Sequence, residues 1–334
     1  MVGNRSAPVT RPAWVDYLAD RLVAGVLVLL VVAFTVLGRG FFSLPSWLAT
    51  ATQLPETLIL AVGETLVIIT AGIDLSVGAV LGFSAMTSAI AMQAMTNAQS
   101  PQPVILVVGL LVALLAGLGW GILNGVLIAR VRVSPFIATL ATLGMATGAT
   151  FIISGGSTVT TMPAVLGTWV NAALFGVFPV IFLLALVPVL TMAFVLSRTR
   201  FGLRSYAIGS HLRAARVAGI DVRRHLVKVY AIAGLLAGFD GLLVTARFVT
   251  ATPFYGANDE LSAIAAVIVG GASLFGGRGN MFGTFVGALI VSIIPTGLIV
   301  MGLSAYWQMV GVGAVIILAV FLDQLRHRGR EAAL

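Results

Sequence analysis

The sequence predicts an all-α, polytopic membrane protein with about ten transmembrane helices. Its 334 residues are 59% hydrophobic and only 9% charged, with a mean hydropathy of +1.10, whereas soluble domains carry about 25% charged residues. Apolar stretches of the roughly 20 residues that a bilayer requires recur along the whole chain. Lysine and arginine, in addition, fall almost entirely into alternate connecting segments.

The apolar stretches divide the chain into one transmembrane domain, 22–322, between hydrophilic segments 1–21 and 323–334 that we expect in the cytoplasm. The first stretch resembles a signal peptide in length, but no small-residue cleavage site follows it, so we expect a retained helix. The expected spans are 22–38, 53–71, 75–95, 103–129, 134–154, 178–197, 226–247, 259–275, 280–301 and 305–322.

Charge sets the expected orientation. With the N-terminus inside, seventeen of the 19 Lys and Arg residues lie in inside segments, and only Arg39 and Arg247 lie outside. This asymmetry is the positive-inside pattern, and an even number of spans returns the C-terminus to the cytoplasm. The net charge of +8 is therefore a matter of orientation, and we expect no nucleic-acid partner. In the uncharged outer connection 154–177, residues 163–171 form either a short interfacial helix or a plain connector.

The segment Thr70–Gly78, TAGIDLSVG, interrupts two apolar runs with a carboxylate. A charge at membrane depth costs roughly 2.5–3.5 kcal/mol or more and is rarely accidental. We expect Gly72, Asp74 and Ser76 to form a helix break at the cytoplasmic side. Capping of the third span by Asp74 is the favoured interpretation, because Asp is a preferred N-cap residue, and contact with cargo is the alternative.

A weak internal repeat relates spans 2–5 to spans 7–10. Asp74-Leu75-Ser76 opens the third span as Glu260-Leu261-Ser262 opens the eighth, and Asn124-Gly125 has a counterpart in Thr296-Gly297. The offset of five spans requires opposite orientations, which gives inverted repeats of the kind common in transporters. Two glycine stripes, which favour close helix packing in lipid, comprise Gly117, Gly121, Gly125 and Gly279, Gly283, Gly287.

The segment 198–225 is the longest of the expected inside loops. Ser210 is a candidate N-cap and Gly219 a candidate stop for a short helix over 211–218. One face of this helix carries small residues and another carries arginines, which suits docking into the groove of a partner. The arginines could instead fix topology or touch anionic lipid. The docking candidates are Ser210, His211, Arg213, Ala215, Arg216 and Gly219.

Other polar or bulky residues are candidates for a translocation path or for helix contacts. Glu64 and Asp240 lie within spans, and Glu260 opens one. Asn124 could bind a hydroxyl group, but Asn inside a bundle more often bridges helices. Phe136 begins the fifth span at the inside, as a gate or as a core aromatic. Arg247 is expected to cap the outer end of its helix rather than to pair with Asp240.

Several functions are excluded or made improbable by composition. The chain has no cysteine, and its three histidines are scattered through basic segments, so we expect no metal site. A Walker A loop requires lysine after its glycines, and the only lysine, Lys228, follows none. We therefore expect no cofactor and no catalytic residue, and any ATP must be bound by another chain.

Four stretches, in register and in order, resemble permease subunits of ribose-type monosaccharide ABC importers: TAGIDLSVG at 70–78, LNGVLIARVRVSPFIATLATLG at 123–144, TRFGLRSYAIGSHLRAARVAGIDV at 199–222 and VIVGGASLFGGRGNMFGTFVGA at 267–288. The similarity runs from about 55 to 322. Related permeases for branched-chain amino acids share the fold, but GIDLSVG resembles the sugar branch.

The resemblance implies a dimer of ten-helix permeases in the bacterial inner membrane, as a homodimer or with a paralogue, surrounded by lipid. It further implies an extracytoplasmic sugar-binding protein, a cytoplasmic ATPase and a coupling helix at 211–218. The chain departs from the family pattern at His211, Asp240 and Thr296, where Asn, a small apolar residue and Asn are usual. The alternative from another class is a proton-coupled secondary transporter that uses Glu64, Asp74 and Asp240 as a relay.

Overall fold

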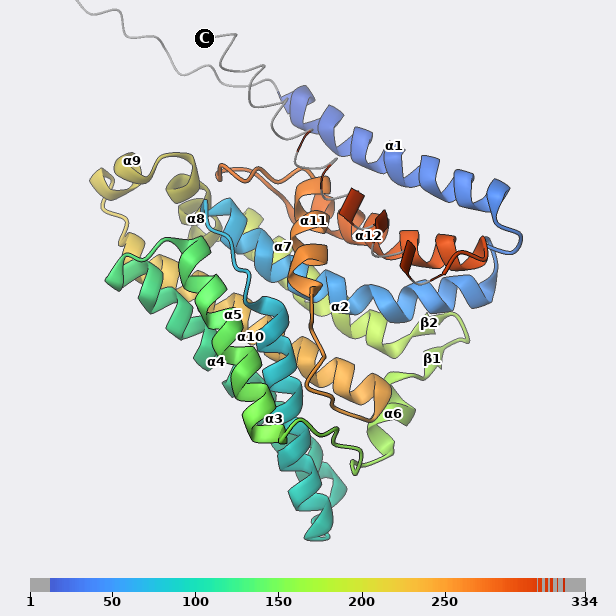
Figure 1. Ribbon diagram of the computed structural model, residues 1–334. Coiled ribbons are helices and arrows are strands. Elements are labelled where there is room, and N and C mark those ends of the chain that lie inside the picture. The colour runs from blue at the N-terminus through green and yellow to red at the C-terminus, as the bar shows by residue number, and fades with distance from the viewer. Residues whose placement is uncertain are drawn as a thin grey trace, which may run out of the picture.

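The computed structural model describes residues 13–304 and positions 306, 307, 310, 311, 313, 314, 317 and 321, with side chains described from Val23 onward. The expected tail 323–334, residues 1–12 and part of the expected span 305–322 lie outside the described residues. The described chain is helical apart from one antiparallel pair of two-residue strands. Figure 1 shows long helices side by side, with α1 lying against α12 on one flank.

The elements, in chain order, are α1 Ala13–Leu37, α2 Leu44–Ile69, α3 Val77–Asn97, α4 Gln102–Val126, the π-helix η1 Leu127–Val131, α5 Pro135–Ser154, α6 Val165–Val170, β1 Ala173–Leu174, β2 Phe178–Pro179, α7 Val180–Arg198, α8 Arg200–Ser210, α9 Leu212–Val217, α10 Val222–Phe248, α11 Asp259–Val269 and α12 Met281–Val300.

Seven described helices are long and apolar enough to cross a membrane: α2, α3, α4 with η1, α5, α7, α10 and α12. The prediction of a helical, multi-pass membrane protein is confirmed at this level. Of the two alternatives left open for 163–171, the structure has the short helix, α6, and Trp169 on it is exposed. The arrangement of ten spans with inverted repeats and cytoplasmic termini stays a prediction.

Within the described residues, helix α1 covers the expected span 22–38 almost completely and includes residues 13–21 as well. Its apolar part, Val23–Leu37, agrees with the expected span.

The expected span 259–275 was wrong in extent. Helix α11 ends at Val269, and Gly270 and Gly271 follow, the latter at φ +92°. Eleven residues rise only about 16 Å, roughly half of the hydrocarbon thickness. In Figure 1, α11 crosses α2 and α12 steeply instead of running alongside them.

Glycines allow the central helices to touch backbone to backbone. On α4, Gly117 lies against Gly238 of α10, Gly121 against the Tyr230 carbonyl and Gly125 against Val227. On α12, Gly283 and Gly287 lie in the same way against the end of α11. Gly279 is not part of that helical stripe, because it lies in the preceding turn at φ +142°.

Hydroxyl groups join α2 to α12 within the apolar interior. Thr65 and Thr284 share a hydrogen bond of 2.6 Å, and Thr50 donates to Thr296 at 3.1 Å. Thr296 is the position where the family pattern has Asn, and here its hydroxyl serves a contact between helices. Hydrogen bonds of this kind contribute about 0.6 kcal/mol on average between membrane helices.

Replacing Gly117 by alanine is expected to lower the free energy of unfolding by about 1–3 kcal/mol, the usual cost of overpacking, because the β-carbon would collide with the backbone of α10. Gly119→Ala is the matched control on the same helix, since no atom lies within 4 Å of its β-carbon position. Thermal melting of the detergent-solubilised variants measures both. Equal melting temperatures would contradict the close packing of α4 on α10.

Candidate functional site

The break between α2 and α3 is built around Asp74. The Asp74 carboxylate is buried and accepts hydrogen bonds at Oδ1 from the Ser76 amide at 2.9 Å and from the Ser76 hydroxyl at 2.6 Å. An aspartate that bonds the amide two residues onward forms an Asx turn. Ser76, not Asp74, occupies the N-cap position of α3, and its own side chain makes no capping bond. Asp74 therefore shapes the entry to the helix from two residues upstream.

Asp74 is the end of a buried chain of hydrogen bonds that joins three helices. The Asn124 amide on α4 donates to the Ser76 hydroxyl at 2.8 Å, and the Thr142 hydroxyl on α5 donates to Asn124 Oδ1 at 2.7 Å. Each of these side chains is almost fully buried. In this structure Asn124 bridges helices, which is the commoner of the two roles weighed from the sequence.

Burial raises the pKa of the Asp74 carboxyl, and the hydrogen bonds from Ser76 and Asn124 oppose that effect. Two further polar groups lie close by. Glu64 of α2 is fully buried and interacts electrostatically with Asp74. Its two carboxyl oxygens have no hydrogen-bond partner among the described residues. The Tyr230 hydroxyl lies 2.6 Å from the place that a β-carbon at Gly72 would occupy, so only glycine fits there.

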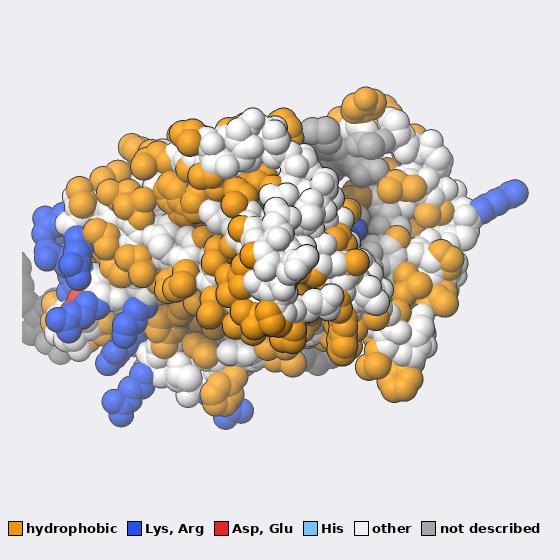
Figure 2. Space-filling model, turned by 90° about the horizontal axis from the view of Figure 1, so that it is seen from below, with side chains coloured by type: hydrophobic (Ala, Val, Ile, Leu, Met, Phe, Trp, Pro, Cys, Tyr) orange, Lys and Arg blue, Asp and Glu red, His pale blue; other side chains and the backbone are white. Residues whose placement is uncertain are grey.

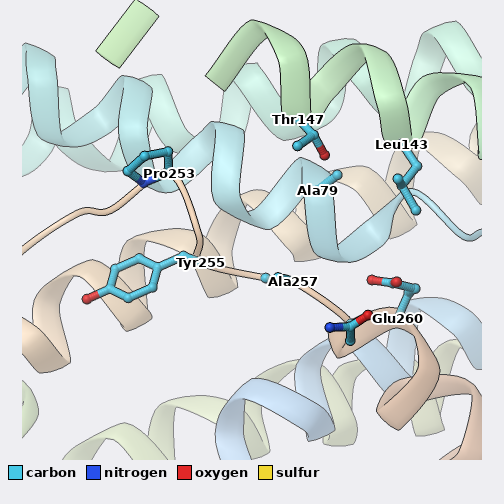
Figure 3. Close-up of a pocket in the computed structure, with 9 residues that line it drawn as sticks. Ala79, Leu143, Thr147, Pro253, Tyr255, Ala257 and Glu260 are labelled. Carbon is cyan, nitrogen blue, oxygen red and sulfur yellow. The ribbon is translucent and has the colours of Figure 1, made fainter. Parts of the chain in front are cut away.

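A cavity of about 190 Å³ lies between α3, α5 and the loop that precedes α11. Figure 3 shows the Glu260 carboxyl and the Thr147 hydroxyl pointing into it, whereas the Tyr255 ring points away. The Tyr255 hydroxyl instead bonds Thr250 at 2.9 Å. The cavity is lined by Ala79, Leu143, Thr147, Pro253, Tyr255, Gly256, Ala257, Asn258 and Glu260. Apolar walls with a few converging polar groups are typical of small-molecule sites.

Close backbone contacts fix the wall of this cavity. Gly78 and Gly82 on α3 lie against the Gly256 and Tyr255 carbonyl oxygens, where a β-carbon would collide. Asn258, at φ +70°, and Gly256, at φ +77°, turn the loop into the start of α11. The two helix openings expected to be repeat counterparts are thus spatial neighbours, since Glu260 lies beside Gly78.

A second group of carboxylates lies where α2, α10 and α11 meet. Glu56 and Asp259 interact electrostatically with each other and with the fully buried Asp240. Arg247 Nη1 lies 3.9 Å from Glu56 Oε2. Arg247 therefore pairs with a carboxylate of another helix, and it lies in the last turn of α10, the position expected from the sequence. No direct pair between Arg247 and Asp240 occurs, as expected.

The loop 198–225 folds as two helices rather than one. Helix α8 was not expected, whereas α9 coincides with the predicted docking helix. Its N-cap is His211, whose Nδ1 accepts from the Ala214 amide, and not Ser210, which ends α8. Gly219 at φ +80° ends the helix as expected, with Ile220 N–H bonding the Ala215 carbonyl. This is the bond pattern of a Schellman stop.

Helix α9 shows most of its surface to solvent. Of its predicted small face only Ala215 is buried, against Ile208 and Val222, while Leu212 and Val217 are exposed. Arg213 and Arg216 are exposed as well. Figure 2 shows basic side chains gathered at one end of the molecule and hydrophobic ones across its middle.

Phe136, at the start of α5, is also exposed. Within the described residues, no group of three acidic or histidine side chains could hold a metal ion.

These features define a multi-pass helical membrane protein with a partly open cavity beside Glu260 and a capped, basic helix at one end. Residues 46–320 match the family described as "Branched-chain amino acid transport system / permease component". The chain therefore belongs to this family of permeases. No solved structure matches it.

Curated relatives match nearly the whole chain. It is 37% identical to the ribose import permease protein RbsC of Escherichia coli K12, over 90% of this chain and 92% of the relative. It is 39% identical to the protein of the same name from Bacillus subtilis, over 89% and 90%. Identity to the D-allose transport system permease protein AlsC of Escherichia coli K12 is 37%, over 82% and 81%.

Sequence reasoning missed several residues that complete these sites. Thr142 supports the break, and the Tyr230 hydroxyl lies beside Gly72 without a hydrogen-bond partner among the described residues. Thr147 and Asn258 line the cavity, and Glu56 pairs with Arg247. Threonine is common in membrane helices, where it can bond its own backbone, so its type alone gives no signal. Tyr230 is different, because a buried tyrosine usually places its hydroxyl beside a polar group.

Replacing Asn124 by leucine is expected to lower the free energy of unfolding by about 1–3 kcal/mol, because buried hydroxyl groups lose a partner. The loss should shrink in the background of Thr142→Val, since the two residues share one hydrogen bond. Thermal melting of the two single variants and the double variant gives the coupling. Thr150→Val is the control, because Thr150 bonds only its own helix. Strict additivity would contradict the network.

Proposed function

We propose that this protein is the transmembrane subunit of an ABC importer that forms the path for a monosaccharide or a related small polyol across the bacterial inner membrane. A separate ATPase powers it, and an extracytoplasmic binding protein supplies the sugar. The observation that carries the proposal is 37–39% identity over about nine tenths of the chain to ribose import permeases. The galactose/methyl galactoside import permease MglC of Haemophilus influenzae, 34% identical over 95% of this chain, supports the same class.

The proposed topology has ten spans in two inverted repeats with both termini in the cytoplasm. The uneven distribution of Lys and Arg supports this orientation. It places α8, α9 and the start of α5 at the cytoplasmic side and α6 at the outer side. The short, steep α11 fits the broken helices found at the centre of inverted-repeat transporters.

In this proposal α9 docks on the ATPase. A capped helix that exposes Leu212, Val217 and two arginines offers an apolar contact with a charged rim, which suits a groove on a partner protein. The rigid anchoring of Ala215 against α8 and α10 supports a role in docking, because a topology signal alone needs no ordered helix.

The cavity beside Glu260 belongs to the proposed path, which passes between this chain and a second permease subunit. Helix α5, at the cavity, exposes large apolar side chains that a second copy or lipid would cover. These include Phe136, Ile137, Leu140 and Met145. Carboxylate, amide and hydroxyl groups suit sugar hydroxyls, which both donate and accept hydrogen bonds.

Reconstitution tests the class of transporter. Proteoliposomes that contain this chain, the ATPase and the binding protein should take up sugar only when ATP is present on the side of the membrane that carries the ATPase. Uptake should survive an uncoupler and stop when ATP is omitted. Uptake by this chain alone, abolished by the uncoupler but independent of ATP, would instead establish a proton-coupled transporter.

Replacing Arg213 and Arg216 by serine is expected to lower the amount of ATPase that co-purifies by several-fold, because two charged contacts at the rim are lost. Binding of the sugar-loaded binding protein should remain unchanged. Arg39→Ser, on the expected outer side, is the control. Unchanged co-purification would contradict the docking role of α9.

Replacing Thr147 by valine should reduce the rate of uptake roughly two- to tenfold, since one hydrogen bond is worth about 0.5–1.5 kcal/mol. Glu260→Gln should act in the same direction, because it keeps the shape of the side chain and removes its charge. Uptake of labelled sugar measures both against the Thr150→Val control. Parental rates in both variants would remove this cavity from the path.

A further inference from the structure

The end of α8 lies in contact with two parts of the membrane domain at once. A β-carbon at Gly209 would collide with the Ile69 carbonyl at the end of α2 and lie 2.5 Å from the Gly277 amide. The same Gly277 amide donates to the Ile69 carbonyl at 2.8 Å. Because the last carbonyls of a helix have no partner within it, the turn 273–279 satisfies one for α2. Three segments that are distant in sequence thus meet at one point.

Tyr206 adds a directional contact between α8 and the same turn. Its hydroxyl donates to the Gly279 carbonyl at 2.7 Å. Gly276, Gly277 and Gly279 of this turn are all at positive φ, which residues with a side chain adopt less readily. The tight conformation of the turn therefore depends on these glycines. Ser210, the last residue of α8, lies against Gly277.

Helix α8 is itself held firmly to the docking helix and to α10. Ile208 of α8, Ala215 of α9 and Val222 of α10 form a small buried cluster. Ser205 and His225 share a hydrogen bond of 2.9 Å, and the His225 ring packs on Phe201 at 4.5 Å. A displacement of α9 would therefore carry α8 with it.

The turn 273–279 leads directly to the cavity through α11. This helix places Glu260 in the cavity at its first turn and reaches Gly270, before the turn, at its other end. At about 16 Å it is a short, stiff rod. Gly271, at φ +92° and with open space around it, provides a joint between the rod and the turn.

We propose that Tyr206 and Gly209 are positioning residues that couple the docking helix to the cavity, with the 273–279 turn and α11 as the lever between them. The proposal rests on the importer function proposed above. When the ATPase moves α9, α8 pushes the turn, the lever tilts, and Glu260 shifts in the cavity. Simultaneous contact with Ile69 moves the end of α2, next to the break at Asp74.

The test uses the complete complex in proteoliposomes and measures sugar molecules taken up per ATP hydrolysed. Tyr206→Phe removes only the hydrogen bond, and Gly209→Ala separates α8 from the turn while favouring the helix itself. Both variants should lower the ratio at least threefold, while co-purification of the ATPase stays within twofold of the parent. Tyr306→Phe, at an exposed tyrosine, and Gly119→Ala, at a glycine with open space around it, are the matched controls.

A parental ratio in both variants would overturn the proposal. So would loss of ATPase binding or of the folded melting transition, because the contact would then serve docking or folding rather than coupling. A parent complex without ATP-driven uptake would overturn the importer function itself, and that outcome is visible before any variant is made.

Discussion

The structure depends on one constraint: a membrane helix that stops inside the protein must have its free backbone groups satisfied by the protein. The end of α2 and the start of α3 meet this constraint from two sides. The Gly277 amide bonds the Ile69 carbonyl, and Asp74 bonds the Ser76 amide. Asn124 and Thr142 then connect the break to α4 and α5. The buried Asp74 carboxylate thus helps to hold α3, α4 and α5 together.

Close packing follows from the same demand. Where α4 meets α10 and α11 meets α12, backbones touch at glycines, and no side chain larger than hydrogen fits. Such contacts hold helices at fixed separation, so a displacement at one end of the molecule is transmitted instead of being absorbed. This stiffness makes it physically reasonable that a short helix at the basic end influences a cavity near the centre.

The sequence predicted what depends on composition and local patterns. Hydropathy placed most long helices, TAGIDLSVG marked the break, and Gly219 marked the end of the docking helix. The sequence did not predict the features that depend on contacts between residues distant in the chain. Nothing local indicated that Arg247 would find Glu56 on another helix or that α8 would form before α9. The end of α11 at Val269 did have a local signal, the pair Gly270-Gly271, which the prediction overlooked. Thr147 and Asn258 line the cavity only because α3 and α5 pack against a loop that is distant from them in the sequence.

We expect Asp74 to support the fold through its bonds to Ser76, rather than to bind sugar or relay protons. Replacing Asp74 by asparagine tests this expectation directly, because the Oδ1 acceptor for Ser76 is kept and only the charge is lost. Measured in the reconstituted complex, the variant should keep the parental KM for sugar and the parental melting temperature, while Asp74→Leu should melt earlier. A rise in KM of tenfold or more in Asp74→Asn, with an unchanged melting temperature, would contradict the account.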